Sequence, residues 1–165
     1  MDNKKLTFSA LLIALGTMTG HLIYIPIGVA KAFPVQHLIN ILSAVLLGPA
    51  YAVWNAFAIS LFRNMLGTGS LLAFPGSMIG ALMSGLLYQK FKSQNWALAG
   101  ELIGTGFLGA VAAYPIAKYL MGSSAAVFFF VIPFALSAAG GALIAYLFLK
   151  AVEKADSLSF IDELN

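Results

Sequence analysis

Residues 32–62, AFPVQHLINILSAVLLGPAYAVWNAFAISLF, decide how this chain folds. The stretch contains no Lys, Arg, Asp or Glu, and it is interrupted near its centre by Gly48-Pro49, a pair that ends or kinks a helix. It can therefore form one long kinked helix, or two short helices that meet in a tight turn. The first alternative gives the whole chain five apolar helices, and the second gives it six.

The composition of the rest of the chain is equally apolar. Of the 165 residues, 61% are hydrophobic and only 9% are charged, whereas an ordinary soluble domain carries about 25% charged residues. A globule of this size cannot bury so many apolar residues, so the composition predicts a protein embedded in lipid. It argues against a cytosolic enzyme, a nucleic-acid-binding module and a disordered tail, and the length fits a single transmembrane domain, residues 1–165.

Several kinds of chemistry are disfavoured by the residues and motifs that the sequence lacks. There is no cysteine, and the two histidines are far apart, so we expect neither a disulfide nor a metal site. No P-loop, H-E-x-x-H or G-x-S-x-G motif is present, so we expect neither a catalytic site nor a cofactor. The net charge is +3, but the basic residues occur in ones and twos, which is typical of membrane anchors and not of a nucleic-acid-binding surface.

The distribution of basic residues favours six helices. With five, four Lys or Arg residues fall on one side of the membrane and five on the other, which is no bias. With a turn at residues 48–49, one side holds Lys4, Lys5, Lys90, Lys92, Lys150 and Lys154, and the other holds Lys31, Arg63 and Lys118. Because basic residues accumulate on the cytoplasmic side, this six-against-three distribution predicts an all-α bundle of six transmembrane helices with both termini in the cytoplasm.

The expected helices cover about 5–26, 34–48, 50–65, 71–89, 96–118 and 124–152, and residues 153–165 form a cytoplasmic tail. The second and third helices are about 24 Å long, less than the ~30 Å thickness of the hydrocarbon core. Loops 27–33 and 63–70 must then enter the bundle, and irregular backbone at that depth is tolerated only where protein or a cavity surrounds it. We therefore expect a cavity that opens to the outer face.

The N-terminal segment has a second interpretation. Lys4 and Lys5 followed by an apolar run resemble a secretory signal peptide, with Ala30-Lys31-Ala32 as a cleavage site. The apolar run is longer than the usual hydrophobic region of such a peptide, so we interpret it as the first transmembrane helix.

Polar residues within the expected spans gather at the outer end of the bundle, and each is a candidate for a site because a polar group in lipid needs a partner. For Tyr24 and Lys118 we favour an anchoring role, and for Arg63 a ligand clamp and a structural tie remain open. Aromatic residues near the same end, Phe33, Phe74 and Phe128–Phe130, could stack on a flat ligand. The polar candidates are His21, Tyr24, Gln36, His37, Asn40, Arg63, Asn64, Tyr114 and Lys118.

Two further features have more than one interpretation. Glu101, the only acidic residue inside a span, could take part in proton coupling, form a structural hydrogen bond or contact a partner subunit. Small residues recur at four-residue spacing in several helices and can either pack internally or dock a partner protein. The triplet is Ser77, Ala81 and Gly85. The pairs are Ala10 with Ala14, Gly16 with Gly20, Gly100 with Gly104, and Gly141 with Ala145.

Four runs resemble the ThiW family: FPVQHLIN (33–40), LGP (47–49), RNMLGTG (63–69) and LAFPGSMIGA (72–81). ThiW proteins are substrate-binding S components of energy-coupling factor (ECF) transporters, a class of ABC importer in prokaryotic cell membranes. The resemblance covers essentially the whole chain, including the six-helix plan. It implies a pocket near the outer face, capped by the loop between the first two helices, and a complex with a transmembrane coupling protein and two cytoplasmic ATPases.

The resemblance also implies particular site residues. The A-x-x-x-A pattern through which many S components contact the coupling protein is matched by Ala10 and Ala14. The implied ligand is the thiazole precursor of thiamine, hydroxyethylthiazole, although thiamine, its pyrimidine precursor or another vitamin remain alternatives, as does a stand-alone proton-coupled carrier. The expected ligand-binding residues are Gln36, His37, Asn40, Arg63, Asn64, Phe74 and Tyr114.

Overall fold

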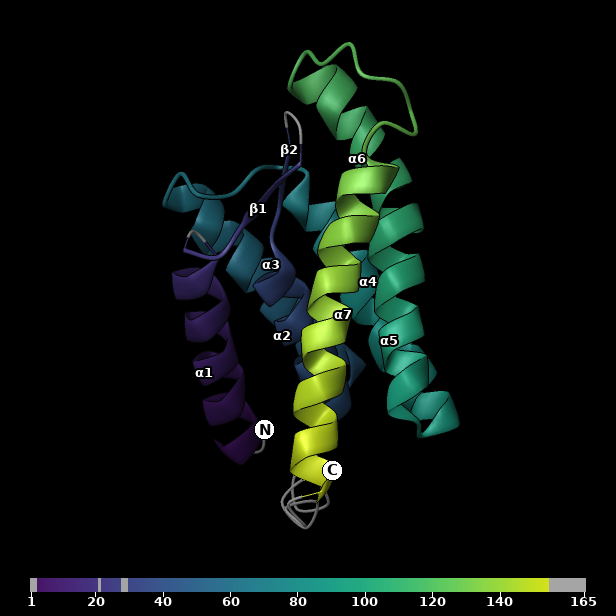
Figure 1. The fold of residues 1–165 in the computed structure, drawn as a ribbon. Helices are drawn as coiled ribbons and strands as arrows, with labels where there is room; N and C mark the ends of the chain where they lie inside the picture. Colours follow the sequence, from purple (N-terminus) through teal and green to yellow (C-terminus); the bar gives the residue numbers. More distant parts are fainter. Residues whose placement is uncertain (1–2, 21, 28–29, 155–165) are drawn as a thin grey trace.

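The computed structural model describes residues 3–20, 22–27 and 30–154 (Figure 1). His21 and nearly all of the expected tail at 153–165 lie outside these residues. Six helical rods make up the described chain, as the charge distribution predicts. They are α1 (Asn3–Thr19), α2 (Pro34–Leu47), α3 (Pro49–Met65), α4 (Ala73–Phe91), a continuous rod of α5 (Gln94–Ile103), η1 (Gly104–Gly109), α6 (Ala110–Pro115) and η2 (Ile116–Leu120), and α7 (Val131–Lys154).

The chain reverses direction at Gly48 and Pro49, which confirms the two-helix interpretation of residues 32–62. Gly48 has φ +90°, a conformation that glycine adopts without the steric penalty of a Cβ. Pro49 then starts α3, where the missing amide hydrogen is not needed. The far ends of the two helices meet, because the guanidinium of Arg63 donates a hydrogen bond to Gln36 Oε1.

The segment between α1 and α2 differs from the expectation of an all-helical chain. The first helix was expected to continue to residue 26, but α1 ends at Thr19, and two short strands, β1 (Ile25–Ile27) and β2 (Ala30–Ala32), pair antiparallel. Pro26 cannot donate a helical hydrogen bond, and the β-branched side chains of its two isoleucine neighbours favour extended backbone. The hairpin lies at the end of the bundle opposite the described chain ends (Figure 1).

The two longest rods are the ones that could cross a membrane by length and hydropathy. They are Gln94–Leu120, with 27 residues, and Val131–Lys154, with 24 residues. Two stretches of the first rod, η1 and η2, have wider π-helical turns, a geometry often found at functional sites. The 14-residue α2 is a shorter apolar helix, as expected.

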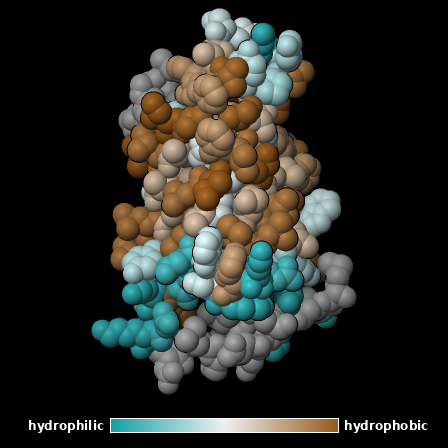
Figure 2. Space-filling model, turned by 90° about the vertical axis from the view of Figure 1, so that its right-hand side faces the viewer, coloured by the Kyte–Doolittle hydropathy of each residue, from teal (hydrophilic) through white to brown (hydrophobic). Residues whose placement is uncertain are grey.

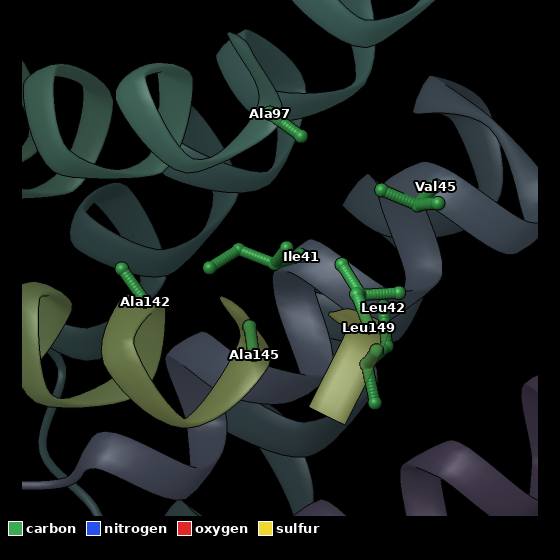
Figure 3. Close-up of a cluster of buried hydrophobic side chains, with 7 residues drawn as sticks. All are labelled: Ile41, Leu42, Val45, Ala97, Ala142, Ala145 and Leu149. Atoms are coloured by element: carbon green, nitrogen blue, oxygen red, sulfur yellow. The ribbon is translucent and has the colours of Figure 1, made fainter. Parts of the chain in front are cut away.

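Helix α2 occupies the centre of the bundle and packs against α1, α3, α4, α5 and α7. Its lower half contributes Ile41, Leu42 and Val45 to a buried apolar cluster, which three alanines of α5 and α7 and Leu149 of α7 complete (Figure 3). Because alanines such as Ala97 and Ala145 face α2, the three helices approach one another closely. This packing fixes the position of the polar upper half of α2 relative to α5 and α7.

The outer surface is strongly apolar. Leu11, Trp54, Phe107 and Leu143 are all exposed, whereas Asn40, Asn55 and Glu101 are fully buried. Apolar side chains cover the middle of the face shown in Figure 2, and hydrophilic side chains gather at its lower end. Buried polar groups beneath an apolar surface are what a lipid environment favours.

Candidate functional site

A cavity of about 490 Å³ lies at the end of the bundle where α2 begins and α3 ends. Its wall combines aromatic rings with hydroxyl, amide, imidazole and guanidinium groups, and its volume falls in the range of small-molecule sites. The aromatic residues are Phe33, Phe129, Phe130 and Phe134, and the polar ones are Gln36, His37, Arg63, Thr68, Ser70, Ser77, Thr105 and Ser137.

Glu101 forms a polar centre beside the cavity. Its carboxyl group is fully buried, and Oε1 lies 2.8 Å from His37 Nδ1, 2.9 Å from Asn40 Nδ2 and 2.9 Å from Thr105 Oγ1. Among the described residues, the second oxygen of Glu101, Oε2, has no hydrogen-bond partner. The acid therefore connects α5 to α2 and orients His37, a residue that lines the cavity.

Arg63 forms a second polar centre at the end of α3. Besides its hydrogen bond to Gln36, its guanidinium donates to the backbone carbonyls of Thr68, at 3.1 Å, and Gly20, at 3.5 Å. Its Cζ lies 3.9 Å from the centre of the Phe33 ring, a cation–π contact. A single buried side chain thus joins the turn after α1, the start of α2 and the loop after α3.

The two polar centres are connected by a chain of hydrogen bonds. Gln36 accepts from Arg63 and donates from Nε2 to Ser77 Oγ at 3.0 Å. Asn40 donates from Nδ2 to the same Ser77 oxygen, at 3.0 Å, and to Glu101. Removing one member of such a buried network leaves its neighbours unsatisfied, so the residues act as a unit.

Phe33 links the hairpin to two helices. It directly follows β2, and its backbone N–H donates to Ser137 Oγ of α7 at 2.7 Å. Its ring lies under the guanidinium of Arg63, which belongs to α3. Movement of the hairpin would therefore disturb both contacts at the cavity wall.

A sequence model described as thiamine-precursor transporter protein (ThiW) matches residues 6–155. The match covers nearly all of the described helices and every residue of the cavity wall. The chain belongs to the ThiW family. No curated protein and no solved structure matches it.

Membership of this family indicates a thiamine-precursor transporter. Together with the two apolar helices long enough to cross a bilayer, it indicates a membrane protein. It also agrees with the absence of catalytic motifs from the sequence. The cavity, which lies within the matched region, is the natural candidate for the precursor-binding site.

The seven residues expected to bind ligand in this ThiW-family protein lie in different places. Gln36, His37 and Arg63 come together on the cavity wall. Asn40 lies behind them, between Ser77 and Glu101. The other three do not line the cavity: Asn64 donates to the carbonyls of Ser60 and Ser70, Phe74 packs against Phe57, and Tyr114 contacts Lys118.

Some cavity residues were not among the expected ligand-binding residues. Ser77 appeared only as part of a small-residue stripe, and Thr105 was not among the candidates. Thr105 follows Glu101 by four residues, a spacing that places both on one helix face and could have indicated it. Phe134 and Ser137 gave no such signal, because their place on the wall depends on how α7 is rotated against α2.

Most of the small-residue stripes are buried in helix–helix contacts, as expected for internal packing. Ala10 and Ala14 differ, because both are exposed. They lie in a shallow apolar groove on α1, bordered by Ile13, Met18 and Phe62. Of the stripes named from the sequence, the one formed by Ala10 and Ala14 thus lies on the outer surface of the ThiW-family protein.

Gly20 provides a test of whether Arg63 positions the cavity wall. A Cβ at this position would lie 2.7 Å from Arg63 Nε and 2.9 Å from its Cδ, so Gly20→Ala must displace the guanidinium. We expect it to weaken ligand binding about 10-fold, or about 1.4 kcal/mol, although Gly20 does not line the cavity. Isothermal titration calorimetry of the purified protein measures the effect.

Gly16→Ala is the matched control for this prediction. A Cβ there meets Ile59 at 2.6 Å and so disturbs the same α1–α3 contact without touching Arg63. Equal losses of affinity in the two variants would mean that packing of α1, and not the position of Arg63, determines the affinity.

Proposed function

We propose that this ThiW-family protein is the substrate-binding S component of an ECF-type importer and that it captures hydroxyethylthiazole in the cavity described above. It would lie in a prokaryotic cell membrane with six spans and both termini in the cytoplasm, so that the cavity opens outward. The observation that carries the proposal is the convergence of Gln36, His37 and Arg63 with aromatic rings in one cavity, within the region matched by the thiamine-precursor transporter family.

The chemistry of the cavity suits a small aromatic alcohol. Phe33 and Phe134 offer ring surfaces for a flat heterocycle, and the side chains of Gln36 and His37 offer hydrogen bonds. The two buried charged groups nearby, Arg63 and Glu101, have opposite signs. A neutral ligand therefore leaves the electrostatic balance of the site unchanged.

Binding of hydroxyethylthiazole to the purified protein tests the ligand. We expect saturable binding in isothermal titration calorimetry, weakened about 10-fold or more by Gln36→Ala, because the variant leaves Arg63 and Ser77 without their shared partner. Lys118→Ala, which changes a cation outside the cavity wall, serves as the control and should retain the wild-type affinity. Tight binding of thiamine or its pyrimidine precursor, with none of the thiazole, would contradict the proposed ligand while leaving the transporter class intact.

We further propose that Ala10 and Ala14 form the surface that docks on the transmembrane coupling protein, whose motion two cytoplasmic ATPases drive. The support is that this stripe is exposed in an apolar groove, in contrast to the buried stripes of the other helices. Small residues on an exposed helix face allow a partner helix to approach closely in lipid.

Replacing both alanines with tryptophan tests this surface. In the double variant Ala10→Trp and Ala14→Trp, we expect ligand binding to remain and ATP-dependent uptake by the reconstituted complex to fall to background, because the bulky rings block close helix contact. Leu11→Trp with Leu15→Trp, at exposed positions one residue further along α1, is the matched control and should transport. Undiminished uptake by the alanine-to-tryptophan variant would contradict the docking role.

A proton-coupled carrier is the second candidate, and the contact between His37 and Glu101 is the observation that favours it. Buried ionisable pairs within helical bundles can serve as proton relays. Liposomes that contain only this protein distinguish the candidates. Uptake without ATP or partners, abolished by Glu101→Gln, would support the carrier and contradict the S-component proposal.

A further inference from the structure

We propose that His37 recognises a hydrogen-bond donor on the ligand, through a tautomer that Glu101 fixes. The inference rests on the proposed function, because it concerns which ligand group the same cavity recognises. The side chain of His37 is about 10% exposed, the residue lines the cavity, and its Nδ1 lies 2.8 Å from Glu101 Oε1. Its other nitrogen, Nε2, makes no hydrogen bond to the described residues and remains for the ligand.

The hydrogen bonds around Glu101 locate the proton shared with His37. Glu101 Oε1 already accepts from Asn40 Nδ2, and the hydroxyl of Thr105 lies 2.9 Å away. An oxygen that accepts such hydrogen bonds is stabilised as a carboxylate. The proton between Oε1 and the imidazole therefore resides on Nδ1, and His37 donates it to Glu101.

The balance of buried charges near the cavity favours a neutral imidazole. Arg63 and Glu101 are the two fully buried residues with formal charges among those described, and their charges cancel. A protonated His37 would give the three groups two cations and one carboxylate, and a low-dielectric interior disfavours this net positive charge. With Nδ1 protonated and the ring neutral, Nε2 carries a lone pair and can only accept a hydrogen bond.

The ligand group opposite Nε2 is therefore a hydroxyl or N–H, and not an ether, a thioether or a bare alkyl chain. His37 determines specificity by contact, and Glu101 is a positioning residue that acts through it. Sites that hydrogen-bond a ligand hydroxyl reject analogues without it, because the buried partner is then left unpaired.

Two ligands that differ in one hydroxyl test the role of His37. We expect the wild-type protein to bind 5-(2-hydroxyethyl)-4-methylthiazole about 10- to 100-fold more tightly than 5-ethyl-4-methylthiazole. In His37→Phe the two affinities should agree within about threefold. Equal binding of both ligands by the wild type, or an unchanged preference in His37→Phe, would overturn the role of His37 but not the proposed function. Binding of neither ligand by the wild type would overturn the proposed ligand and the inference with it.

The same pair of ligands tests Glu101. Glu101→Leu removes the acceptor for Nδ1–H, so we expect the preference for the hydroxyl to be lost. Glu101→Gln retains a carbonyl oxygen that can accept from Nδ1, so it should restore the preference. A purely structural role would be contradicted by this recovery, whereas equal loss in both variants would contradict the tautomer argument.

The wild-type protein provides a readout in which His37 and Glu101 are both unchanged. The ¹⁵N chemical shifts of labelled histidine distinguish the two neutral tautomers and the protonated ring, and the spectrum of His21→Gln identifies the signal of His37. We expect a protonated Nδ1 and an unprotonated Nε2 that shifts when the hydroxyethyl ligand binds. A protonated Nε2 in the ligand-bound protein would overturn the inference.

Discussion

Replacing Arg63 with alanine is expected to abolish measurable ligand binding and to lower the free energy of unfolding by about 3–5 kcal/mol. The side chain is 1% exposed, so its contacts are not shared with solvent. Its loss leaves Gln36 Oε1 and the carbonyl of Thr68 without their donor, and it removes the cation over the Phe33 ring. Each unsatisfied buried acceptor costs about 1–3 kcal/mol.

Calorimetry and thermal denaturation in detergent measure the two effects of Arg63→Ala. Arg63→Lys separates charge from geometry: it keeps the cation but not the planar group that reaches several acceptors at once. We expect this variant to recover part of the stability and little of the affinity. Affinity within threefold of wild type in Arg63→Ala would contradict the role assigned to this residue.

Replacing Gly80 with alanine is expected to destabilise the protein by about 2–3 kcal/mol and to weaken ligand binding. Gly80 of α4 faces η1, and a Cβ there would lie 2.0 Å from Thr105 Oγ1 and 2.9 Å from Glu101 Oε1. The methyl group can be accommodated only if the side chains of Thr105 and Glu101, or the helices that carry them, are displaced, and either change disrupts the hydrogen bonds around Glu101. The loss should exceed the gain of about 1 kcal/mol that alanine brings to a helix interior.

Gly140→Ala is the control for this prediction. It is also a glycine within a helix, but a Cβ there approaches its neighbours, atoms of Pro34, no closer than 3.1 Å. We expect a change in melting temperature much smaller than that of Gly80→Ala. If Gly80→Ala melted at or above the wild-type temperature, the close contact between α4 and η1 would not be important for the site.

The number of helices could be predicted from the sequence because two independent features agree. Gly48-Pro49 interrupts an uncharged stretch, and only a reversal at that point gives an asymmetric distribution of basic residues. The hydrogen bond between Arg63 and Gln36 confirms the reversal. The hairpin was not predicted, since two three-residue strands leave no periodic pattern and the first expected helix extended to Pro26.

The site could be predicted only in part. Gln36, His37 and Arg63 stood out because polar groups in apolar helices need partners. Their actual partners could not be identified, because the contact of His37 with Glu101 joins residues 64 positions apart and depends on the rotation and depth of α2 against α5. The π-helical turn at Gly104–Gly109 changes the helical phase along this rod, so a regular α-helical pattern does not give the direction of side chains beyond it.

A structure of the protein saturated with hydroxyethylthiazole tests the central claim most directly. We expect density for one ligand inside the cavity, in contact with Gln36 and His37 and stacked against Phe33 or Phe134. Ligand density elsewhere on the protein, or an empty cavity at a ligand concentration that saturates binding in solution, would contradict it.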